Sequence, residues 1–283
     1  MKIMSVLSLL CVVCLSTVQA QPLAPRGFKW ELIPELSDEF NGDALDKEKW
    51  HDAHPGWKGR TPSHFSRENV WVENGKLCLR SNSRIKDMSD VNDPIRDVWV
   101  NSAAVSSKKR SAAPGYYYET RMKASNLSMT SSFWFRMGDY SEIDVIEHMG
   151  HPSNRDVAMK EYRYGCNTHV YGKKRNQGYS KDNQYYMPTR GRNAFHVFGL
   201  WWKDPNTLWF YYNGIKVMEV QPSVPFEENL HMIFDTEVFK WNGLPLIENL
   251  NDPAKNTMYV DFVRSFKLVP IKAKKKGTSD IVP

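Results

Sequence analysis

The segment Ser141-Glu142-Ile143-Asp144-Val145-Ile146-Glu147-His148 decides both the expected fold and the expected chemistry of this chain. Its residues favour a β-strand, on which the side chains of residues i and i+2 point to the same face. Glu142 and Asp144 therefore share one face. Strict alternation would place Glu147 on the opposite, apolar face, where an unpaired carboxylate is very costly. A β-bulge at Val145-Ile146 would return Glu147 to the face of the other two acids, and bulges are common beside active sites.

Three carboxylates on one face repel one another, and like charges a few ångströms apart raise the pKa of at least one of them. Such a pair suits a retaining glycosidase, which needs an ionised nucleophile and a protonated general acid about 5–5.5 Å apart. Asp144, between the two glutamates, is expected to hydrogen-bond the nucleophile. Two alternatives stay open: an acidic edge that deters aggregation, and a calcium site, although calcium ligands usually come from loops.

Short segments of the same strand-like kind recur along the chain, rich in Val, Ile, Tyr, Phe and Trp and bounded by Gly, Pro, Asn and Asp. Examples lie at 70–72, 77–80, 116–123, 132–137, 142–147, 167–171, 194–202, 207–212, 231–234 and 258–268. Asn74-Gly75 and Asn213-Gly214 predict hairpin turns. A short helix is expected near 46–50. Ten or more short strands in about 250 residues predict an all-β protein, as a two-sheet sandwich or a barrel.

The composition fits a folded domain. The 283 residues are 41% hydrophobic and 13% aromatic, with ten Trp, so the bulk of the chain is not disordered. Aromatic runs such as 133–135 place rings on both faces of their strands. The rings on the outer face form either a sugar-binding platform or part of a large core. The net charge of +6 owes much to the Lys-rich segment 272–276, so it is weak evidence for a polyanionic partner.

The N-terminus is typical of a signal peptide: Lys2, an apolar stretch over 6–15, and small residues before a cleavage site after Ala20. The alternative is a buried N-terminal helix. No later apolar run is long enough to span a membrane. We therefore expect an exported protein, secreted or periplasmic, with one catalytic domain over 21–270 and a disordered tail over 271–283. Export permits a disulfide between Cys78 and Cys166, but two buried free thiols are as compatible with the sequence.

The acidic segment also carries a resemblance. The run EIDVIE at 142–147, preceded by FWF at 133–135, resembles the ExDxxE signature of glycoside hydrolase family 16. Further segments that resemble the family are DEFNG at 38–42 with LD at 45–46 and Trp50, GYYYETRMK at 115–123, FHVFGL at 195–200, FYYNG at 210–214 and YVDFVR at 259–264. The likeness covers about residues 28–268. It implies a β-jelly-roll sandwich of two antiparallel sheets with a concave substrate cleft, Glu142 as nucleophile, Asp144 as its assistant and Glu147 as acid/base.

The six-residue acidic run, together with KAS at 123–125, SSFWF at 131–135 and WKGR at 57–60, looks most like the agarase and porphyranase branch. The resemblance implies an endo-acting enzyme that cuts β-1,4 bonds of red-algal galactans. Porphyran carries sulfate, whereas agarose is neutral, and a sulfate needs positive charge in the cleft, preferably a guanidinium.

Trp57, Arg60 and Arg136 resemble the porphyranase pocket, and Trp134 shares strand parity with Arg136. These residues favour porphyran, with neutral agarose as the alternative substrate. Arg136 could instead pair with Asp139 or Glu142, and Arg60 could be an exposed loop residue.

Further cleft contacts are expected from two segments. Arg163, Asn167 and His169 share parity on the strand after the acidic one, and Glu237 and Trp241 resemble a segment of the agarase branch that binds substrate. For each of them a purely structural role is the alternative.

Two other function classes compete. A lectin-like sandwich would bind sugar without needing a repelling carboxylate pair. A nucleic-acid binder is disfavoured by the export signal and by a cleft built around acids. We expect a monomer with a polysaccharide substrate, no nucleic-acid partner and no catalytic cofactor. The family resemblance leaves room for a structural calcium, with Asp261 as one candidate ligand.

Overall fold

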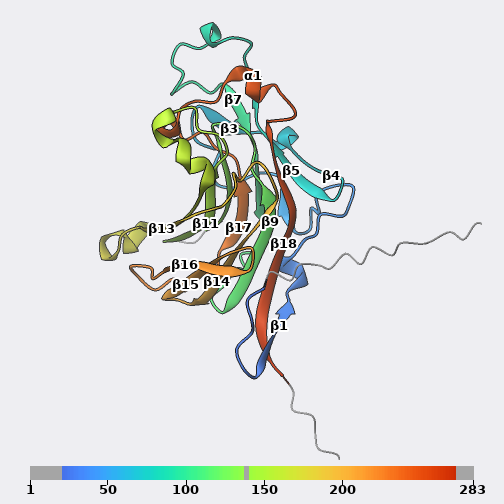
Figure 1. Cartoon of the computed structure of the whole chain (residues 1–283), viewed down its shortest axis with the longest axis vertical. Helices are drawn as coiled ribbons and strands as arrows, with labels where there is room; N and C mark the ends of the chain where they lie inside the picture. The colour runs from blue at the N-terminus through green and yellow to red at the C-terminus, as the bar shows by residue number, and fades with distance from the viewer. Residues whose placement is uncertain (1–20, 137–139, 272–283) are drawn as a thin grey trace, which may run out of the picture.

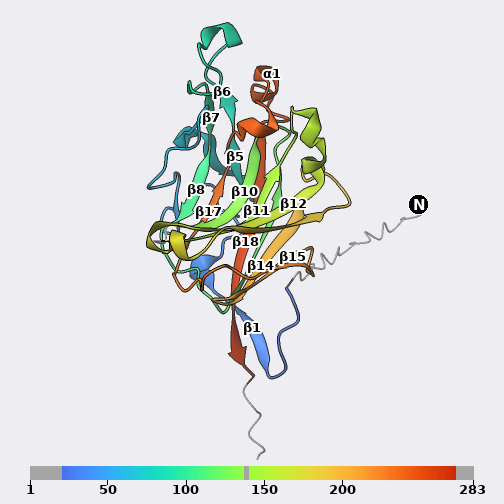
Figure 2. The ribbon, with the colours of Figure 1, turned by 90° about the vertical axis from the view of Figure 1, so that its left-hand side faces the viewer.

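Two antiparallel sheets, packed face to face, make up most of the protein (Figures 1 and 2). The structure is a computed structural model that describes residues 21–136 and 140–271. The expected leader at 1–20 and nearly all of the expected tail lie outside the described residues. No helix in the described ranges is long and apolar enough to cross a membrane.

The first sheet contains β1 (Phe28–Leu32), β4 (Val70–Glu73), β5 (Lys76–Arg80), β9 (Tyr116–Lys123), β14 (His196–Asp204), β15 (Thr207–Tyr212), β16 (Ile215–Val220) and β18 (Thr257–Pro270). In the described part of the chain its order is β16-β15-β14-β9-β18-β5-β4, and β1 also pairs with β18.

The second sheet, named the cleft sheet below, contains β2 (Trp50–His51), β8 (Ala104–Ser107), β10 (Thr130–Arg136), β11 (Ser141–Met149), β12 (Arg163–Val170), β13 (Lys181–Tyr186) and β17 (His231–Asp235). Its order is β13-β12-β11-β10-β17-β8-β2. The acid-bearing strand β11 therefore lies inside the sheet, between β10 and β12.

A small third sheet and several short helices complete the fold. The sheet joins β3 (Ser63–Phe65), β6 (Asn82–Ser83) and β7 (Val100–Ser102). The helical elements are η1 (Pro34–Leu36), η2 (Arg67–Asn69), η3 (Met88–Asp90), η4 (Arg155–Tyr162), η5 (Gly172–Gln177), η6 (Lys240–Asn242) and α1 (Ile247–Leu250). The predicted all-β two-sheet sandwich is confirmed.

Alternation along β10 separates core from cleft. Phe133 and Phe135 are fully buried between the two sheets, where the Phe133 ring stacks on Phe234 with centroids 4.6 Å apart. Tyr118, from β9 of the opposite sheet, meets Phe135 at 4.8 Å. Each such ring stabilises the fold by about 1.5–3 kcal/mol through burial alone. Trp134, the residue between these two, therefore points to the other face of the cleft sheet.

The predicted bulge on β11 is confirmed. Phe133 pairs with Ile146 and the next residue, Trp134, pairs with Asp144, so Val145 is the extra residue. The two edges of β11 also differ. Its pairing with β10 extends to Met149, whereas its pairing with β12 covers only Ser141 to Asp144.

The predicted hairpin turns are present, with left-handed backbone at Asn74-Gly75 and Asn213-Gly214. The helix expected near 46–50 is wrong. The Trp50 amide donates to the Asp46 carbonyl at 2.9 Å, which closes one turn, and the chain then enters β2. A single turn cannot repay the entropy cost of helix nucleation. The Trp50 indole also donates to Asp38 Oδ2 at 2.8 Å, which fixes the residue in its extended position.

Cys78 and Cys166 are both free and buried, on β5 and β12 respectively. Burial raises the pKa of the Cys78 thiol to about 11 and that of Cys166 to about 12, so neither is a reactive thiolate at neutral pH. We expect two free thiols from these positions when the mature protein is denatured without reductant and titrated with a thiol reagent. A result of no free thiol would establish the disulfide instead.

Candidate active site

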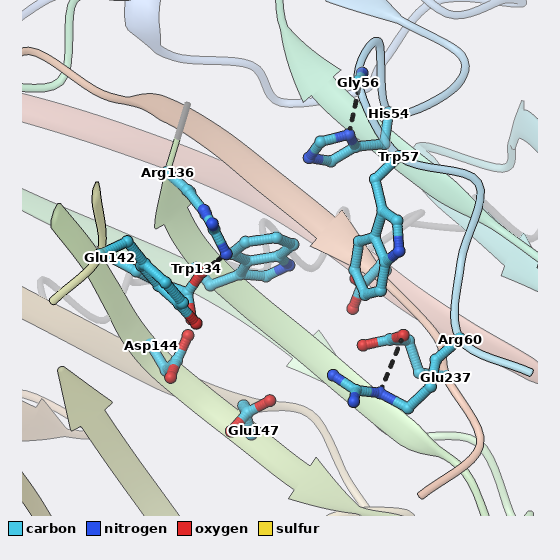
Figure 3. Close-up of a pocket in the computed structure, with 12 residues that line it drawn as sticks. His54, Gly56, Trp57, Arg60, Trp134, Arg136, Glu142, Asp144, Glu147 and Glu237 are labelled. Carbon is cyan, nitrogen blue, oxygen red and sulfur yellow. Dashed lines mark hydrogen bonds and ion pairs between the residues drawn. The ribbon is translucent and has the colours of Figure 1, made fainter. Parts of the chain in front are cut away.

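A cavity of about 550 Å³ lies over the outward face of the cleft sheet (Figure 3). Its walls are formed by His54, Gly56, Trp57, Arg60, Trp134, Arg136, Glu142, Asp144, Glu147, Tyr171, Asp235 and Glu237. The sequence predicted eight of these residues, including the three acids of β11. Because of the bulge, Glu142, Asp144 and Glu147 all point into the same cavity (Figure 3).

Glu142 is held from two sides. Arg136 Nη1 donates to Glu142 Oε2 at 2.7 Å, and the Tyr171 hydroxyl donates to Oε1 at 3.3 Å. Asp144 was expected to hydrogen-bond this glutamate. Instead, its Oδ2 atom is buried without a hydrogen-bond partner, and His169 Nε2 lies 3.4 Å away.

The other two acids on β11 favour their protonated forms. Burial raises the pKa of Glu147 to about 8, and the charges of Asp144 and Glu142 add to this rise. Burial, and then the neighbouring Glu142, raise the pKa of Asp144 well above its ordinary value. The strand therefore presents Glu142 held by a guanidinium, Glu147 with a pKa of about 8 that keeps its proton at neutral pH, and Asp144 with a pKa that is also raised.

The opposite end of the cavity contains a second guanidinium. Arg60 Nε lies 3.5 Å from Glu237 Oε1 (Figure 3), and its guanidinium carbon lies 5.0 Å from the Phe239 ring centre and 5.8 Å from that of Trp57. Burial raises the pKa of Glu237 well above its ordinary value, and the nearby Asp235 raises it further.

The rings of His54, Trp57 and Trp134 form a wall of the cavity between the two arginines. The His54 ring stacks on Trp134 with centroids 5.9 Å apart and planes 13° apart, and Trp57 meets Trp134 edge-on at 6.3 Å. Burial and Arg136 lower the pKa of His54 to about 4, so this ring is neutral. Flat, uncharged rings of this kind suit the apolar faces of sugars.

Of the remaining predicted contacts, some lie near the cavity residues and one does not. His169 reaches the acids, and Asn167 Nδ2 lies 3.0 Å from His169 Nε2. Trp241 is 51% exposed and lies beyond Arg60, 5.8 Å from its guanidinium. Arg163 does not line the cavity, because its side chain lies back over Gly165 on β12.

Of the alternatives open for Arg136, the pairing with Glu142 is the one observed, whereas Asp139 lies outside the described residues. Arg60 is an exposed loop residue, as its alternative had it, with 44% of its side chain exposed, and it also lines the cavity beside Glu237.

Sequence reasoning missed four lining residues: His54, Gly56, Tyr171 and Asp235. Tyr171 shares parity with His169, so extending the expected strand face by two residues would have found it. Asp235 lies in line with Ser132 and Glu147 across β17, β10 and β11, a relation that only the strand register reveals. His54 and Gly56 lie in a loop without a periodic pattern.

Among residues 21–136 and 140–271, one group of side chains has metal-ligand character. Potential ligand atoms of Glu142, Asp144 and His169 lie within 4.8 Å of one another. The Arg136 guanidinium bonded to Glu142 opposes a cation there, so the fit is poor. Asp261, the candidate calcium ligand, pairs with Arg121 at 2.6 Å.

Comparison with known proteins identifies the family of this chain. Residues 30–268 match the family model described as the GH16 domain of β-porphyranases A–D. The chain belongs to glycoside hydrolase family 16. This family 16 enzyme is 35% identical to β-porphyranase B of Phocaeicola plebeius, covering 89% of this chain and 88% of the relative. It is 32% identical to β-agarase AgaA of Microbulbifer thermotolerans, covering 95% of this chain and 68% of that one.

Among solved structures, the enzyme is similar to the β-porphyranase BpGH16B from the human gut bacterium Bacteroides plebeius. The TM-score is 0.75 at 33% identity, covering 90% of this chain and 97% of that chain. The predicted jelly roll is confirmed, and membership of a hydrolase family decides against the lectin-like alternative.

Proposed function

We propose that this enzyme is an exported, endo-acting, retaining hydrolase that cuts β-1,4 bonds in porphyran. The observation that carries the substrate is the presence of two guanidinium groups, Arg60 and Arg136, in one cavity with the β11 acids and the ring wall. A sulfate ester binds a guanidinium fork through charge-assisted hydrogen bonds, which a neutral sugar unit cannot do. The porphyranase relatives support the same substrate.

In the proposed mechanism Glu142 attacks the anomeric carbon as the leaving oxygen takes the Glu147 proton. The raised pKa of Glu147 supports its role as the acid, because a proton must be present before the bond breaks. Glu147 then removes a proton from the water that releases the sugar from Glu142. Asp144 lies beside both glutamates. In this mechanism it assists Glu142 by balancing the charge around it. Two carboxylic residues suffice for this chemistry, so we propose no catalytic cofactor.

The pKa of Glu147 predicts the alkaline limb of the pH profile. A carboxyl whose pKa is raised to about 8 is protonated below that pH and loses its proton above it. We expect kcat/KM to fall about tenfold per pH unit once pH exceeds this value, as measured by initial rates across the alkaline range. A rate that stays constant a full unit beyond that point would contradict Glu147 as the acid.

The alternative substrate is neutral agarose. It is favoured by the agarase relative and by the fact that each guanidinium already lies beside an acidic side chain, Glu142 for Arg136 and Glu237 for Arg60. Digestion of porphyran and agarose side by side, with analysis of the products, decides between them. Sulfated oligosaccharides released from porphyran, with agarose left intact, are the expected result. Rapid release of neutral oligosaccharides from agarose alone would replace the porphyranase proposal by the agarase one.

Export and oligomeric state belong to the same proposal. An exported protein that acts on a polymer needs no partner subunit to reach its substrate, so we propose a monomer. N-terminal sequencing of the protein recovered from outside the cell should begin at Gln21 if the leader is removed after Ala20.

A further inference from the structure

Tyr171 touches both members of the Arg136–Glu142 ion pair. Its hydroxyl donates to Glu142 Oε1 at 3.3 Å, and its ring lies 3.8 Å from the guanidinium carbon of Arg136. The same guanidinium donates to the other oxygen of Glu142 at 2.7 Å. Tyr171 therefore completes a cluster of three side chains. In it the Glu142 carboxyl group, the Arg136 guanidinium and the Tyr171 phenol each contact the other two.

The backbone fixes Tyr171 where these contacts can form. The residue directly follows β12, and its amide donates to the Tyr140 carbonyl at 2.7 Å, just before β11 begins. It shares parity with His169, so its side chain points to the cleft face of the sheet. Burial and Glu142 raise the pKa of the phenol to about 12, so the hydroxyl keeps its proton and acts as a donor at neutral pH.

We propose that Tyr171 is the positioning residue of this site: its hydroxyl orients Glu142 for attack, and its ring holds Arg136 in place for a sulfated substrate. The inference rests on the proposed function, in which Glu142 is the nucleophile. Both oxygens of Glu142 accept a hydrogen bond, which prevents the carboxylate from rotating. Orientation of a nucleophile acts on the chemical step, whereas placement of a cation that meets the substrate acts on binding.

The two contacts can be separated by two substitutions. Tyr171→Phe removes the hydroxyl and keeps the ring, so we expect kcat to fall about tenfold with KM unchanged. The fall should be the same on porphyran and on porphyran stripped of its sulfate esters. Tyr171→Leu removes the ring as well. It should add a rise in KM of about tenfold for the sulfated polymer only, because Arg136 loses the face on which it stacks.

Tyr179→Phe is the matched control, since Tyr179 lies between β12 and β13 and is 69% exposed. It should change neither constant. Thermal unfolding of all three variants checks that each is folded. Full kcat in Tyr171→Phe would overturn the role of the hydroxyl, and an equal rise in KM on both polymers in Tyr171→Leu would overturn the role of the ring. Retained turnover in Glu142→Gln would instead refute the proposed function itself, so the two failures are distinguishable.

Discussion

Replacing Glu142 or Glu147 by Gln should reduce turnover by several orders of magnitude, because each variant lacks one of the two groups on which the proposed mechanism depends. Glutamine matches glutamate in size, and both positions face a cavity rather than the packed interior between the sheets. The fold should therefore survive. Reducing ends released from porphyran measure the loss, and circular dichroism with thermal unfolding measures the fold.

Two further experiments would test which glutamate is the nucleophile and which is the acid/base. With added azide, Glu142→Ala should yield a glycosyl azide of inverted configuration and Glu147→Ala one of retained configuration, because azide replaces a different group in each. Glu219→Gln is the matched control, since the exposed Glu219 side chain pairs with Lys216 on β16, a strand of the other sheet. NMR detection of an initially inverted product from the unaltered enzyme would refute the retaining mechanism.

Arg60→Ala should lower kcat/KM on porphyran about tenfold to a hundredfold, the effect of losing ~1.5–3 kcal/mol from a charge-assisted contact. Activity on porphyran without its sulfate esters should change little. Arg60 is the sharper probe of the two arginines because it pairs with Glu237, whereas Arg136 contacts Glu142 directly. Arg136→Ala should therefore impair both polymers, with the larger loss on the sulfated one.

Arg96→Ala controls for the loss of one positive charge, since that side chain is 87% exposed in a surface loop. Initial rates on both polymers give the comparison. An equal loss on the two polymers in Arg60→Ala would mean that Arg60 supports the cavity wall through Glu237 and does not recognise sulfate.

The acidic strand was predictable because its conformation depends on residues that are close together in the sequence. Strict alternation would have buried Glu147 as an unpaired carboxylate, and one extra residue in the strand avoids that cost. This reasoning predicted the bulge at Val145, and the strand register confirms it. The hairpins at Asn74-Gly75 and Asn213-Gly214 were predictable for the same reason, since two residues decide the turn.

What could not be predicted depends on residues far apart in the chain. Asp235 joins the site only because β17 pairs with β10, and no sequence spacing encodes that neighbour. Polar edge strands such as β13, with sequence KDNQYY, bury too little to show an apolar pattern. The partners of Arg60 and Arg136 also depend on side-chain geometry, which is why the sequence left open an exposed loop position for Arg60 and an ion pair for Arg136.

The two glutamates of the proposed mechanism lie on parts of β11 that differ in backbone pairing. Glu142 and Asp144 lie on the half that is hydrogen-bonded to neighbours on both sides, while Glu147 lies past the bulge, where β12 no longer pairs with it. Backbone that is hydrogen-bonded to strands on both sides resists displacement, whereas backbone hydrogen-bonded on one side opens at lower free energy. In the proposed mechanism Glu142 must form a bond at a fixed point, and it lies on the part of the strand that resists displacement. In the same mechanism Glu147 gives a proton to the departing sugar and takes one from the arriving water, and it lies on the part of the strand that moves more easily.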